Sequence, residues 1–459
     1  MHNSRLQART RQQQLNELSR QAGHTNAVDF FNLLTGPELL KLTDAHLPEH
    51  RERLYPPTVT LSMFIQQVLS EDGSCQRAVN GWAAQCTAEG LPFQSVRTGG
   101  YCRARQRLPL AMVQSLTRVS GDRLSSGAHP GWRWRNRPVK LVDGTGLSMP
   151  DTPDNQAHFP QPCTQAAGVG FPAAQLVGVI CLATGAVLDV AIGPSQGKGN
   201  SEHGLLRRLL GVFKRDDVML ADALYCSYWL IASLQAAGID VVFQQHGSRK
   251  TDFRRGQRLG VRDHLVSWPK PKHCPPWMTA EQFAACPSEL TLREVKVKGR
   301  VLVSTLENVG KQDLASLYGQ RWHVELDFRN IKTTLGMDVL RCRSARMIEI
   351  ELWVNLLAYN LIRMLMAQAA VESGLEPRAL SFKHTVQVWT QWTPILRGTK
   401  DWQRDTLFRL IAQVQVGKRP GRVEPRACKR RPKRSKWLKV PREQARQQVR
   451  KLGYYLPNG

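Results

Sequence analysis

The sequence contains few acidic residues and no closely spaced pair of cysteines. Asp and Glu total 37 against 64 Lys and Arg, which gives a formal net charge of +27 and a pI near 10.2. Enzymes that act on small molecules rarely carry such an excess, whereas proteins that bind DNA or RNA do. The ten cysteines form no C-x-x-C pair, and His273, Cys274 and Cys286 lack the spacing of zinc ligands. We therefore expect no structural zinc, no disulfide framework, and reduced thiols in the cytoplasm.

Long hydrophobic segments are also scarce. The N-terminal sequence MHNSRLQARTRQQQLNELSRQAG has no apolar stretch of the kind found in signal peptides. The apolar run at 173–192 approaches the length of a membrane span, but it contains Gln175, Asp189 and a central Thr184–Gly185 pair. Its Val and Ile content favours two strands joined by a tight turn. We therefore expect no contact with a membrane.

Residues 1–135 have a helical pattern. Pro, Gly and polar residues separate the apolar runs FFNLLTGPELLKL, LSMFIQQVL and AMVQSLTRVSGDRL. Within this region Arg103, Arg105 and Arg107 follow a Gly-Gly pair. They indicate either a short helix that lies against DNA phosphates or a solvated connector, and the sequence favours neither.

A strand and helix pattern begins at Pro138. The segment VKLVDGTGL predicts a buried strand that ends at Asp143. The sequence next predicts a hairpin of two strands at 176–182 and 186–192. After it come a helix at 201–213, a strand at 217–221, a helix at 227–237 and a strand at 239–243. This order is typical of a mixed sheet covered by helices, which is an α/β domain.

The periodicity is lost between 244 and 298, where basic, Gly and Pro residues are frequent and only short β-like pieces such as 290–297 occur. An irregular stretch of this length inside a domain is usually functional or an insertion. A strand at 301–305 resumes the regular pattern, and IEIELWVNLLAYNLIRMLMAQAA predicts a core helix. We divide the chain into a helical region at 1–135, an α/β domain at 136–345, a helical region at 346–415 and a basic tail at 416–459.

The tail is strongly basic. Between Lys418 and Lys451 there are 15 Lys and Arg residues and two acids. With Trp437 among them, this composition is typical of a segment that wraps a phosphate backbone and is disordered without one. The alternative is a tail that only improves solubility.

Four residues near the end of the α/β domain share one face of a predicted helix. At about 100° per residue, Tyr318, Arg321, Glu325 and Lys332 fall within a sector of about 60° beside an apolar stripe. A carboxylate flanked by cations can hold a metal ion while its neighbours bind phosphates. The alternative is an ordinary amphipathic helix, in which Arg321 and Glu325 form an ion pair.

Two aspartates stand where predicted strands end. Asp143 ends the first strand and Asp222 follows the strand at 217–221, so both are expected at one rim of the sheet, where Glu325 could reach them from the later helix. Two aspartates and a glutamate can hold two Mg²⁺ ions about 4 Å apart, and Mn²⁺ is an alternative ion for oxygen ligands. Taken singly, Asp143 could instead be a turn residue and Asp222 a helix cap.

Three segments of the chain resemble the DDE transposases of bacterial insertion sequences. They are VDGTGLSMPDTPDN, LADALYCSYWL and LYGQRWHVELDFRNIKTTLGM, in this order. The spacing Y-x-x-R-x-x-x-E-x(6)-K resembles the branch named after insertion sequence four, whose catalytic domain has the ribonuclease H-like fold. The resemblance extends from about Gly99 to Pro441 and is weakest at 244–298.

The resemblance implies a role for each of these residues. Asp143, Asp222 and Glu325 would form the metal-binding catalytic triad. Tyr318, Arg321 and Lys332 would contact phosphates at the transposon end. Apart from the resemblance, we expect the helical region at 1–135 to bind DNA ends, and the sequence leaves open whether it also mediates pairing. Residues 244–298 would be the β-rich insertion that such enzymes carry before the glutamate.

One position departs from the family pattern. Relatives often have Asp-Arg at the second block, whereas Ala223 follows Asp222 here. Arg254 or Arg255 could supply the missing phosphate contact. Trp268 and Trp277 could stack on an extruded base, although packing of the insertion is the simpler interpretation.

The resemblance implies a cut-and-paste transposase that acts on double-stranded DNA. It would cleave the inverted-repeat ends of its element and join the 3′-OH ends to target DNA, directly or after a hairpin intermediate. We expect a dimer when two ends are bound and a location at the nucleoid. The alternatives are a ribonuclease H-like nuclease or resolvase without strand transfer, and a non-catalytic DNA-binding protein derived from a transposase.

Overall fold

The computed structural model describes residues 55–88, 90, 94–197, 199–392, 401–417 and 438–453. Two predictions lie outside these residues: the helical run at 30–42 and most of the basic tail, including Trp437. The predicted domain limits at 135, 345 and 415 remain predictions.

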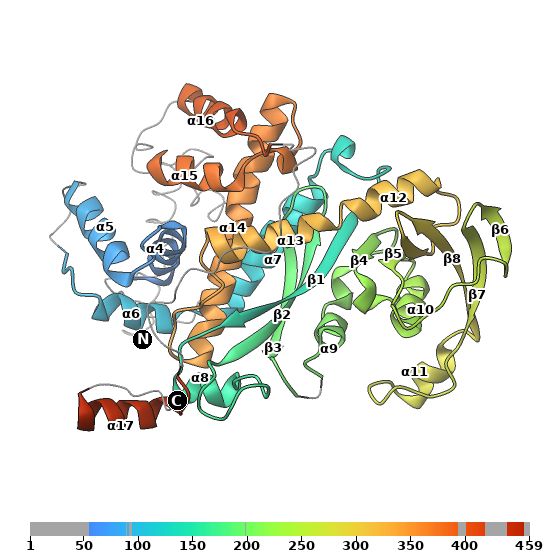
Figure 1. Ribbon diagram of the computed structural model, residues 1–459. Coiled ribbons are helices and arrows are strands. Elements are labelled where there is room, and N and C mark those ends of the chain that lie inside the picture. The colour runs from blue at the N-terminus through green and yellow to red at the C-terminus, as the bar shows by residue number, and fades with distance from the viewer. Residues whose placement is uncertain are drawn as a thin grey trace, which may run out of the picture.

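A nine-stranded sheet forms the centre of the described part (Figure 1), in the order β3-β2-β1-β4-β5-β9-β8-β7-β6. β2 is antiparallel to both β1 and β3, whereas β4 and β5 run parallel to β1. The apolar run at 173–192 forms the β2–β3 hairpin, as predicted. The bounds of these five strands are β1 (Val139–Ser148), β2 (Ala173–Cys181), β3 (Val187–Pro194), β4 (Val218–Ala221) and β5 (Asp240–Gln244).

Side chains that alternate along the strands bury both faces of this sheet. Leu141 faces a core shared with α13 and α14, whereas its neighbour Val142 faces the opposite core, shared with α9 and α10. The four helices are α9 (Glu202–Arg207), α10 (Tyr228–Ala236), α13 (Trp322–Arg329) and α14 (Ala345–Ser373). A mixed sheet covered by helices on both faces confirms the predicted ribonuclease H-like α/β fold.

One helix of this layer is shorter than predicted. α9 ends at Arg207, and the 3-10 turn η2 (Leu210–Val212) replaces the rest of the helix predicted at 201–213. The backbone N–H groups of Arg208 and Leu209 bond to carbonyls three residues back, which ends the α-helical hydrogen-bond pattern.

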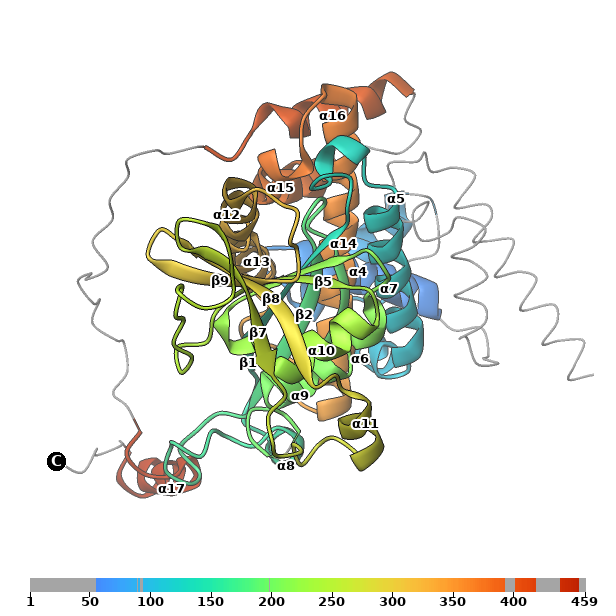
Figure 2. The same ribbon diagram turned by 90° about the vertical axis from the view of Figure 1, so that its right-hand side faces the viewer.

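The irregular segment at 244–298 contributes strands that extend the central sheet (Figure 2). β9 pairs antiparallel with β5 on one side and with β8 on the other, so it joins the inserted strands to the central ones. The insertion is therefore β-rich, as the resemblance implied. Its elements are β6 (Gln257–Gly260), β7 (Asp263–Pro269), α11 (Ala280–Ala285) and β8 (Glu289–Val297), followed by β9 (Arg300–Ser304).

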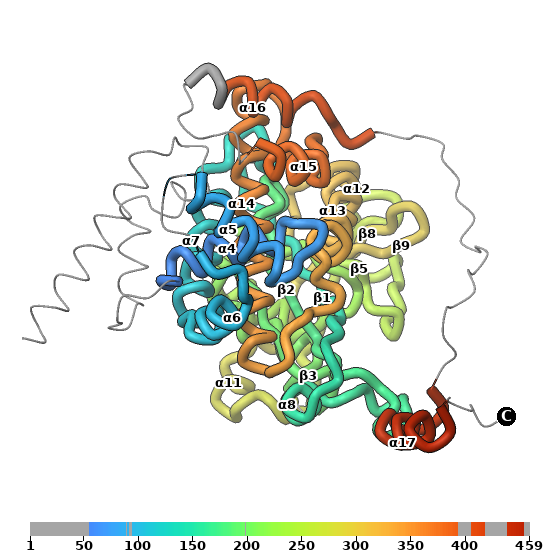
Figure 3. The backbone as a smooth tube through the Cα atoms, turned by 90° about the vertical axis from the view of Figure 1, so that its left-hand side faces the viewer, coloured from blue at the N-terminus to red at the C-terminus, as the bar shows by residue number. Residues whose placement is uncertain are grey.

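The helix α14 is the predicted core helix. By length and composition it could cross a membrane, but 78% of its most apolar 18-residue segment is buried inside the protein. It packs against α4 (Pro57–Leu69) and α7 (Leu110–Ser126), and these three helices lie together in Figure 3. A buried apolar helix of this kind is expected in the core of a globular domain.

The N-terminal helices also include α5 (Cys75–Ala88) and α6 (Gly99–Gln106). Within α6, Arg105 is only 7% exposed and its guanidinium lies 3.8 Å from the centre of the Phe64 ring. Both interpretations of this basic segment are therefore wrong for Arg105, because its charge faces the core. Arg103 and Arg107 remain exposed.

The remaining elements complete the described part. α15 and α16 pack against α14, and Arg442 at the start of α17 pairs with Asp151 at 2.9 Å. The remaining helices are α8 (Pro153–His158), α12 (Lys311–Gly319), α15 (Phe382–Trp392), α16 (Asp401–Gln413) and α17 (Arg442–Leu452). The short turns are η1 (Pro130–Trp132), η3 (Ala223–Tyr225), η5 (Pro377–Ala379) and the π-helical turn η4 (Asn330–Thr334).

Candidate active site

Asp143 lies in the middle of β1, not at the end of a strand as predicted. β1 is longer than predicted because its antiparallel pairing with β2 continues as far as Ser148. The parallel pairing with β4, however, stops at Leu141 and Leu220. Asp143 therefore lies where the neighbouring strand ends, and its interpretation as a turn residue is wrong.

Asp222 directly follows β4 and lies beside Asp143. Each aspartate stands two residues beyond the last paired position of its strand, Leu141 in β1 and Leu220 in β4. The Asp222 Oδ1 accepts a hydrogen bond from the Leu224 backbone N–H at 2.9 Å, so this residue also caps η3. Asp222 therefore lies at the end of a strand, as predicted, and it also caps the helical turn that follows, as the alternative interpretation expected.

The single helix predicted from Tyr318 to Lys332 is divided into three parts: the end of α12, the helix α13 and the π-helical turn η4. Between α12 and α13 the backbone N–H groups of Arg321 and Val324 bond to carbonyls three residues back. A uniform turn of about 100° per residue therefore does not describe this segment.

Three of the four signature residues nevertheless meet beside Asp143. Arg321 Nη2 lies 2.6 Å from Glu325 Oε1, and Arg321 Nη1 lies 3.8 Å from Asp143 Oδ2. Lys332 Nζ donates to the Thr145 hydroxyl at 3.2 Å. These contacts surround an open cleft of about 380 Å³ lined by Asp143, Gly144, Thr145, Glu325, Phe328, Arg329, Lys332, Thr333 and Asp338.

Tyr318 lies deeper than the other three. Only 8% of the residue is exposed, and its hydroxyl donates to Gln244 Oε1 at 3.3 Å. Burial is the main reason that the pKa of Tyr318 is raised. Tyr318 is therefore a neutral hydrogen-bonding group behind the cleft in this structure.

Asp143 carries a shifted pKa of about 6. Burial is the largest cause, and the charges of Asp222 and Glu202 add to it, while the Gly144 N–H and Arg321 oppose it. The raised pKa therefore reflects the burial of this carboxylate first and the neighbouring negative charges second.

The donor set fits a hard divalent cation. Arg321 lies between Asp143 and Glu325, and in the described part of the chain no three His, Cys, Asp or Glu side chains are close enough together to hold a metal ion. Carboxylate oxygens are nevertheless the ligands that Mg²⁺ prefers, and a cation there would offset the negative charges of Asp222 and Glu202, which add to the effect of burial on the pKa of Asp143. Asp143, Asp222 and Glu325 are thus suited to holding Mg²⁺ once Arg321 moves aside.

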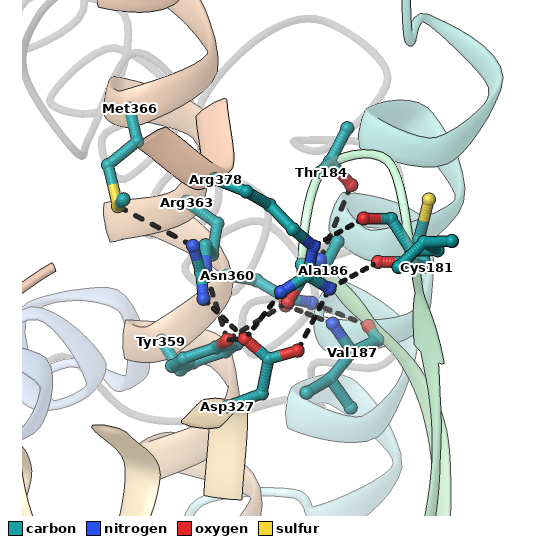
Figure 4. A network of polar contacts seen from close by, with 12 residues as sticks. Cys181, Thr184, Ala186, Val187, Asp327, Tyr359, Asn360, Arg363, Met366 and Arg378 are labelled. Atoms are coloured by element: carbon teal, nitrogen blue, oxygen red, sulfur yellow. Dashed lines mark hydrogen bonds and ion pairs between the residues drawn. The ribbon is translucent and has the colours of Figure 1, made fainter. Parts of the chain in front are cut away.

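A buried ion network fixes the inner side of α13 (Figure 4). Asp327, which is fully buried, pairs with Arg363 of α14 and with Arg378, whose Nη2 lies 2.9 Å from Asp327 Oδ2. Arg378 also donates to the Cys181 carbonyl at 3.0 Å, at the end of β2. Glu325 precedes Asp327 by two positions and so points to the other side of the helix. The network holds the helix that carries Glu325 against the β2–β3 hairpin.

A glycine allows α13 to lie close to the sheet on its cleft side. Gly178 is the partner of Asp143 in the β1–β2 register. A Cβ atom at Gly178 would lie 3.3 Å from the Phe328 ring, closer than an ordinary contact. The Phe328 side chain therefore uses this space.

The structure adds residues that the sequence reasoning missed. Glu202 lies beside Gly144, Asp338 lines the cleft, and Asp327 anchors α13. The sequence gives almost no signal for them, since their positions depend on contacts between distant elements. The one local cue is that Glu202 follows Ser201, a helix cap.

The tryptophans and arginines of the insertion are also placed. Trp268 is buried and its Nε1 donates to Glu294 Oε1 at 2.7 Å, so it packs the insertion. Trp277 is 44% exposed and lies against Arg207, whose guanidinium is 4.3 Å from the ring centre. Arg254 and Arg255 both pair with Asp252 on the surface.

Comparison with known proteins identifies the family. Residues 134–361 match the family described as Transposase DDE domain. The chain is 29% identical over 361 residues to the transposase InsG for insertion sequence element IS4 of Escherichia coli (strain K12), covering 74% of this chain and 78% of that protein. Among solved structures it is similar to a piggyBac transposase synaptic complex with hairpin DNA, with 11% identity, a TM-score of 0.37, and 81% of this chain and 88% of that chain covered. Residues 134–361 therefore form a DDE transposase domain, and the chain is similar over most of its length to a transposase of an insertion sequence.

Proposed function

We propose that this transposase cleaves the inverted-repeat ends of its element by metal-dependent hydrolysis and joins the 3′-OH ends to target DNA. The observation that carries the proposal is that Asp143 in β1 lies beside Asp222, which directly follows the parallel strand β4, while Glu325 of α13 shares the Arg321 guanidinium with Asp143. When bound to these three carboxylates, Mg²⁺ supplies stabilisation of the phosphoryl oxygens and acidifies the attacking water or hydroxyl.

The cations of the site bind and orient the DNA phosphates. Arg321 exchanges its pairing with Glu325 and Asp143 for a bidentate contact with a phosphate, which frees both carboxylates. Lys332, held at the edge of the cleft by Thr145 and Gly146, provides a second cation for the same strand. Tyr318 contributes through a hydrogen bond after the Gln244 contact opens.

Cleavage of labelled DNA tests the proposal. Purified protein and Mg²⁺ are incubated with duplexes that end in the inverted repeat or in a shuffled sequence of the same composition. We expect strand breaks at the repeat boundary only. Equal cleavage of both duplexes would favour a ribonuclease H-like nuclease, and binding without cleavage would favour a non-catalytic DNA-binding protein.

The hairpin intermediate is tested on the same reaction products. A closed-end species on a denaturing gel, converted to open strands at later times, is the expected result for a hairpin route. Direct appearance of 3′-OH ends joined to target DNA, with no closed-end species, would show that strand transfer proceeds without it.

A further inference from the structure

Glu202 is a fourth carboxylate beside the proposed triad, on the opposite side of the sheet from Glu325. It begins α9, one of the two helices over that face. Side chains alternate along β1, so Asp143 faces α13 while the next position, Gly144, faces α9. Glu202 therefore approaches β1 from the side away from the cleft.

The contact with β1 depends on a glycine. A Cβ atom at Gly144 would lie 2.3 Å from the Glu202 carboxyl carbon, and 2.4 and 2.6 Å from its two oxygens. Gly144 does not have a positive φ, so the backbone conformation does not require glycine there. Glycine at 144 thus provides the space in which the Glu202 carboxylate lies, directly after Asp143.

Both oxygens of Glu202 are bound by neutral donors from other elements. Gln175 Nε2 in β2 donates to Oε1 at 2.9 Å, and the Tyr225 hydroxyl in η3 donates to Oε2 at 2.9 Å. Tyr225 follows Asp222 by three residues, in the turn that Asp222 caps. One carboxylate therefore links the segment that carries Asp143 to the segment that carries Asp222.

The charge of Glu202 has no basic partner in the described residues, where no ion pair with Lys, Arg or His involves it. A carboxylate bound only by neutral groups is costly to keep near two other carboxylates. Its position in the first turn of the short helix α9 offsets part of this cost. A cation on the cleft side of β1 would offset the remaining repulsion.

We propose that Glu202 is a positioning residue that fixes the spacing of Asp143 and Asp222 and strengthens divalent-cation binding by the triad. The proposal rests on the proposed function, because it assigns Glu202 a role toward the same cation. Glu202 acts through the backbone of Gly144 and through Tyr225, from behind the strand.

The test measures metal binding separately from catalysis. Full-length wild type and Glu202→Gln are titrated with Mn²⁺ by calorimetry, and their cleavage of repeat-end duplexes is measured over a range of Mg²⁺ concentrations. Gln keeps the shape and one acceptor but removes the charge. We expect about tenfold or greater weakening of Mn²⁺ binding, a typical effect of removing an outer carboxylate, with a similar rise in the Mg²⁺ concentration for half-maximal cleavage.

Further variants separate positioning from folding. Tyr225→Phe removes one hydrogen bond and is expected to weaken Mn²⁺ binding less than Glu202→Gln does, while Glu372→Gln, an exposed carboxylate at the end of α14, is expected to change nothing. Glu202→Asp keeps the charge and is expected to recover part of the affinity. The proposal would be overturned if folded Glu202→Gln bound Mn²⁺ as tightly as wild type does. It would also be overturned if this variant lost thermal stability while its Mn²⁺ binding stayed unchanged.

The two proposals fail in different ways. If wild type does not cleave repeat ends but Glu202→Gln still weakens Mn²⁺ binding, the proposed function is wrong and the role of Glu202 stands. If wild type cleaves and Glu202→Gln has the same metal dependence, the proposed function stands and the role of Glu202 is wrong.

Discussion

Arg321 is the residue on which the resting state of the site depends. Its guanidinium occupies the position between Glu325 and Asp143, at 2.6 and 3.8 Å, and so neutralises part of the charge that a metal ion would otherwise neutralise. The ordinary i, i+4 ion pair and the phosphate-binding role of Arg321 are therefore compatible. The same guanidinium can pair with Glu325 when no DNA is bound and with a phosphate when DNA is bound.

Replacing Arg321 by Gln is expected to have opposite effects on metal and on DNA. Without the competing guanidinium, we expect Mn²⁺ to bind several-fold more tightly, because two carboxylates lose their cation. DNA-end binding should weaken, since a bidentate phosphate contact is lost. Calorimetry measures the affinity for Mn²⁺, and a gel-shift titration measures the affinity for the end duplex. A parallel loss of both affinities would contradict this account of Arg321.

The shifted pKa of Asp143 predicts a pH-dependent stability effect. Its folded-state pKa of about 6 exceeds the ordinary aspartate value of 3.8, so between these two pH values the folded chain binds more protons than the unfolded chain and loses stability as pH rises. In metal-free buffer, Asp143→Asn should therefore be more stable than wild type at pH 8, by roughly 2–3 kcal/mol. At pH 4 the gain should disappear. Urea denaturation of wild type and Asp143→Asn at pH 8 and pH 4 measures the difference in free energy of unfolding. The same difference at both pH values would be inconsistent with the raised pKa of Asp143.

At the scale of elements, α13 connects the site to the core. Its outer side carries Glu325, and its inner side carries Asp327 in the network with Arg363 and Arg378. Because that network is buried, removing one partner leaves charges without compensation.

Asp327→Asn is expected to destabilise the fold by about 3–5 kcal/mol, the usual cost of breaking a buried ion pair from one side. The matched control is Asp313→Asn, because Asp313 pairs with Arg135 at 3.1 Å while both side chains are about half exposed. That change should cost less than about 1 kcal/mol. Chemical denaturation of both variants tests the difference, and equal losses would show that the network adds nothing beyond a surface pair.

The sequence predicted the elements better than their limits. Apolar runs located the strands β1 to β5, because burial on both faces leaves a clear pattern, but β6 and β7 of the insertion were not predicted. The sequence did not reveal that β1 continues past Asp143, since this depends on pairing with β2. It also did not reveal the break between α12 and α13, where hydrogen bonds change to a tighter turn. Asp143, Asp222 and Glu325 were predicted to lie near one another from two strand ends and one helix face, although Asp143 proves to lie within β1. Glu202 and Asp327 were not predicted, because their partners lie far along the chain.

At the scale of the whole molecule, 64 basic residues against 37 acidic ones leave an excess of 27 positive charges, which favours a polyanionic partner. A basic cleft of about 480 Å³ lies in the insertion and is lined by Gln245, Arg249, Lys250, Thr251, Phe253, Arg262, Lys296 and Val301. Arg262 adopts a positive φ of 53°, a conformation that costs energy for a residue other than glycine. This part of the insertion is where we expect DNA phosphates away from the cleavage point.

The double variant Lys250→Gln, Arg262→Gln is expected to weaken DNA binding for every sequence alike. If each residue contacts one phosphate, the slope of log affinity against log salt should fall by about two. Binding titrations between 50 and 300 mM salt, about the range in which phosphate contacts are resolved, measure this slope. Lys383→Gln on α15 is the control and should leave it unchanged. An unaltered slope in the double variant would exclude this cleft from the DNA surface.

Single-turnover cleavage of an inverted-repeat end in Mg²⁺, by wild type and by Glu325→Gln, tests whether Glu325 is part of the catalytic site. We expect both proteins to bind the end equally and the variant to cleave about 10³-fold more slowly or worse, a loss typical of removing one essential catalytic group. The exposed-carboxylate control Glu372→Gln should cleave as wild type does. Undiminished cleavage at the repeat boundary by Glu325→Gln would contradict the claim that Glu325 completes the metal site with Asp143 and Asp222.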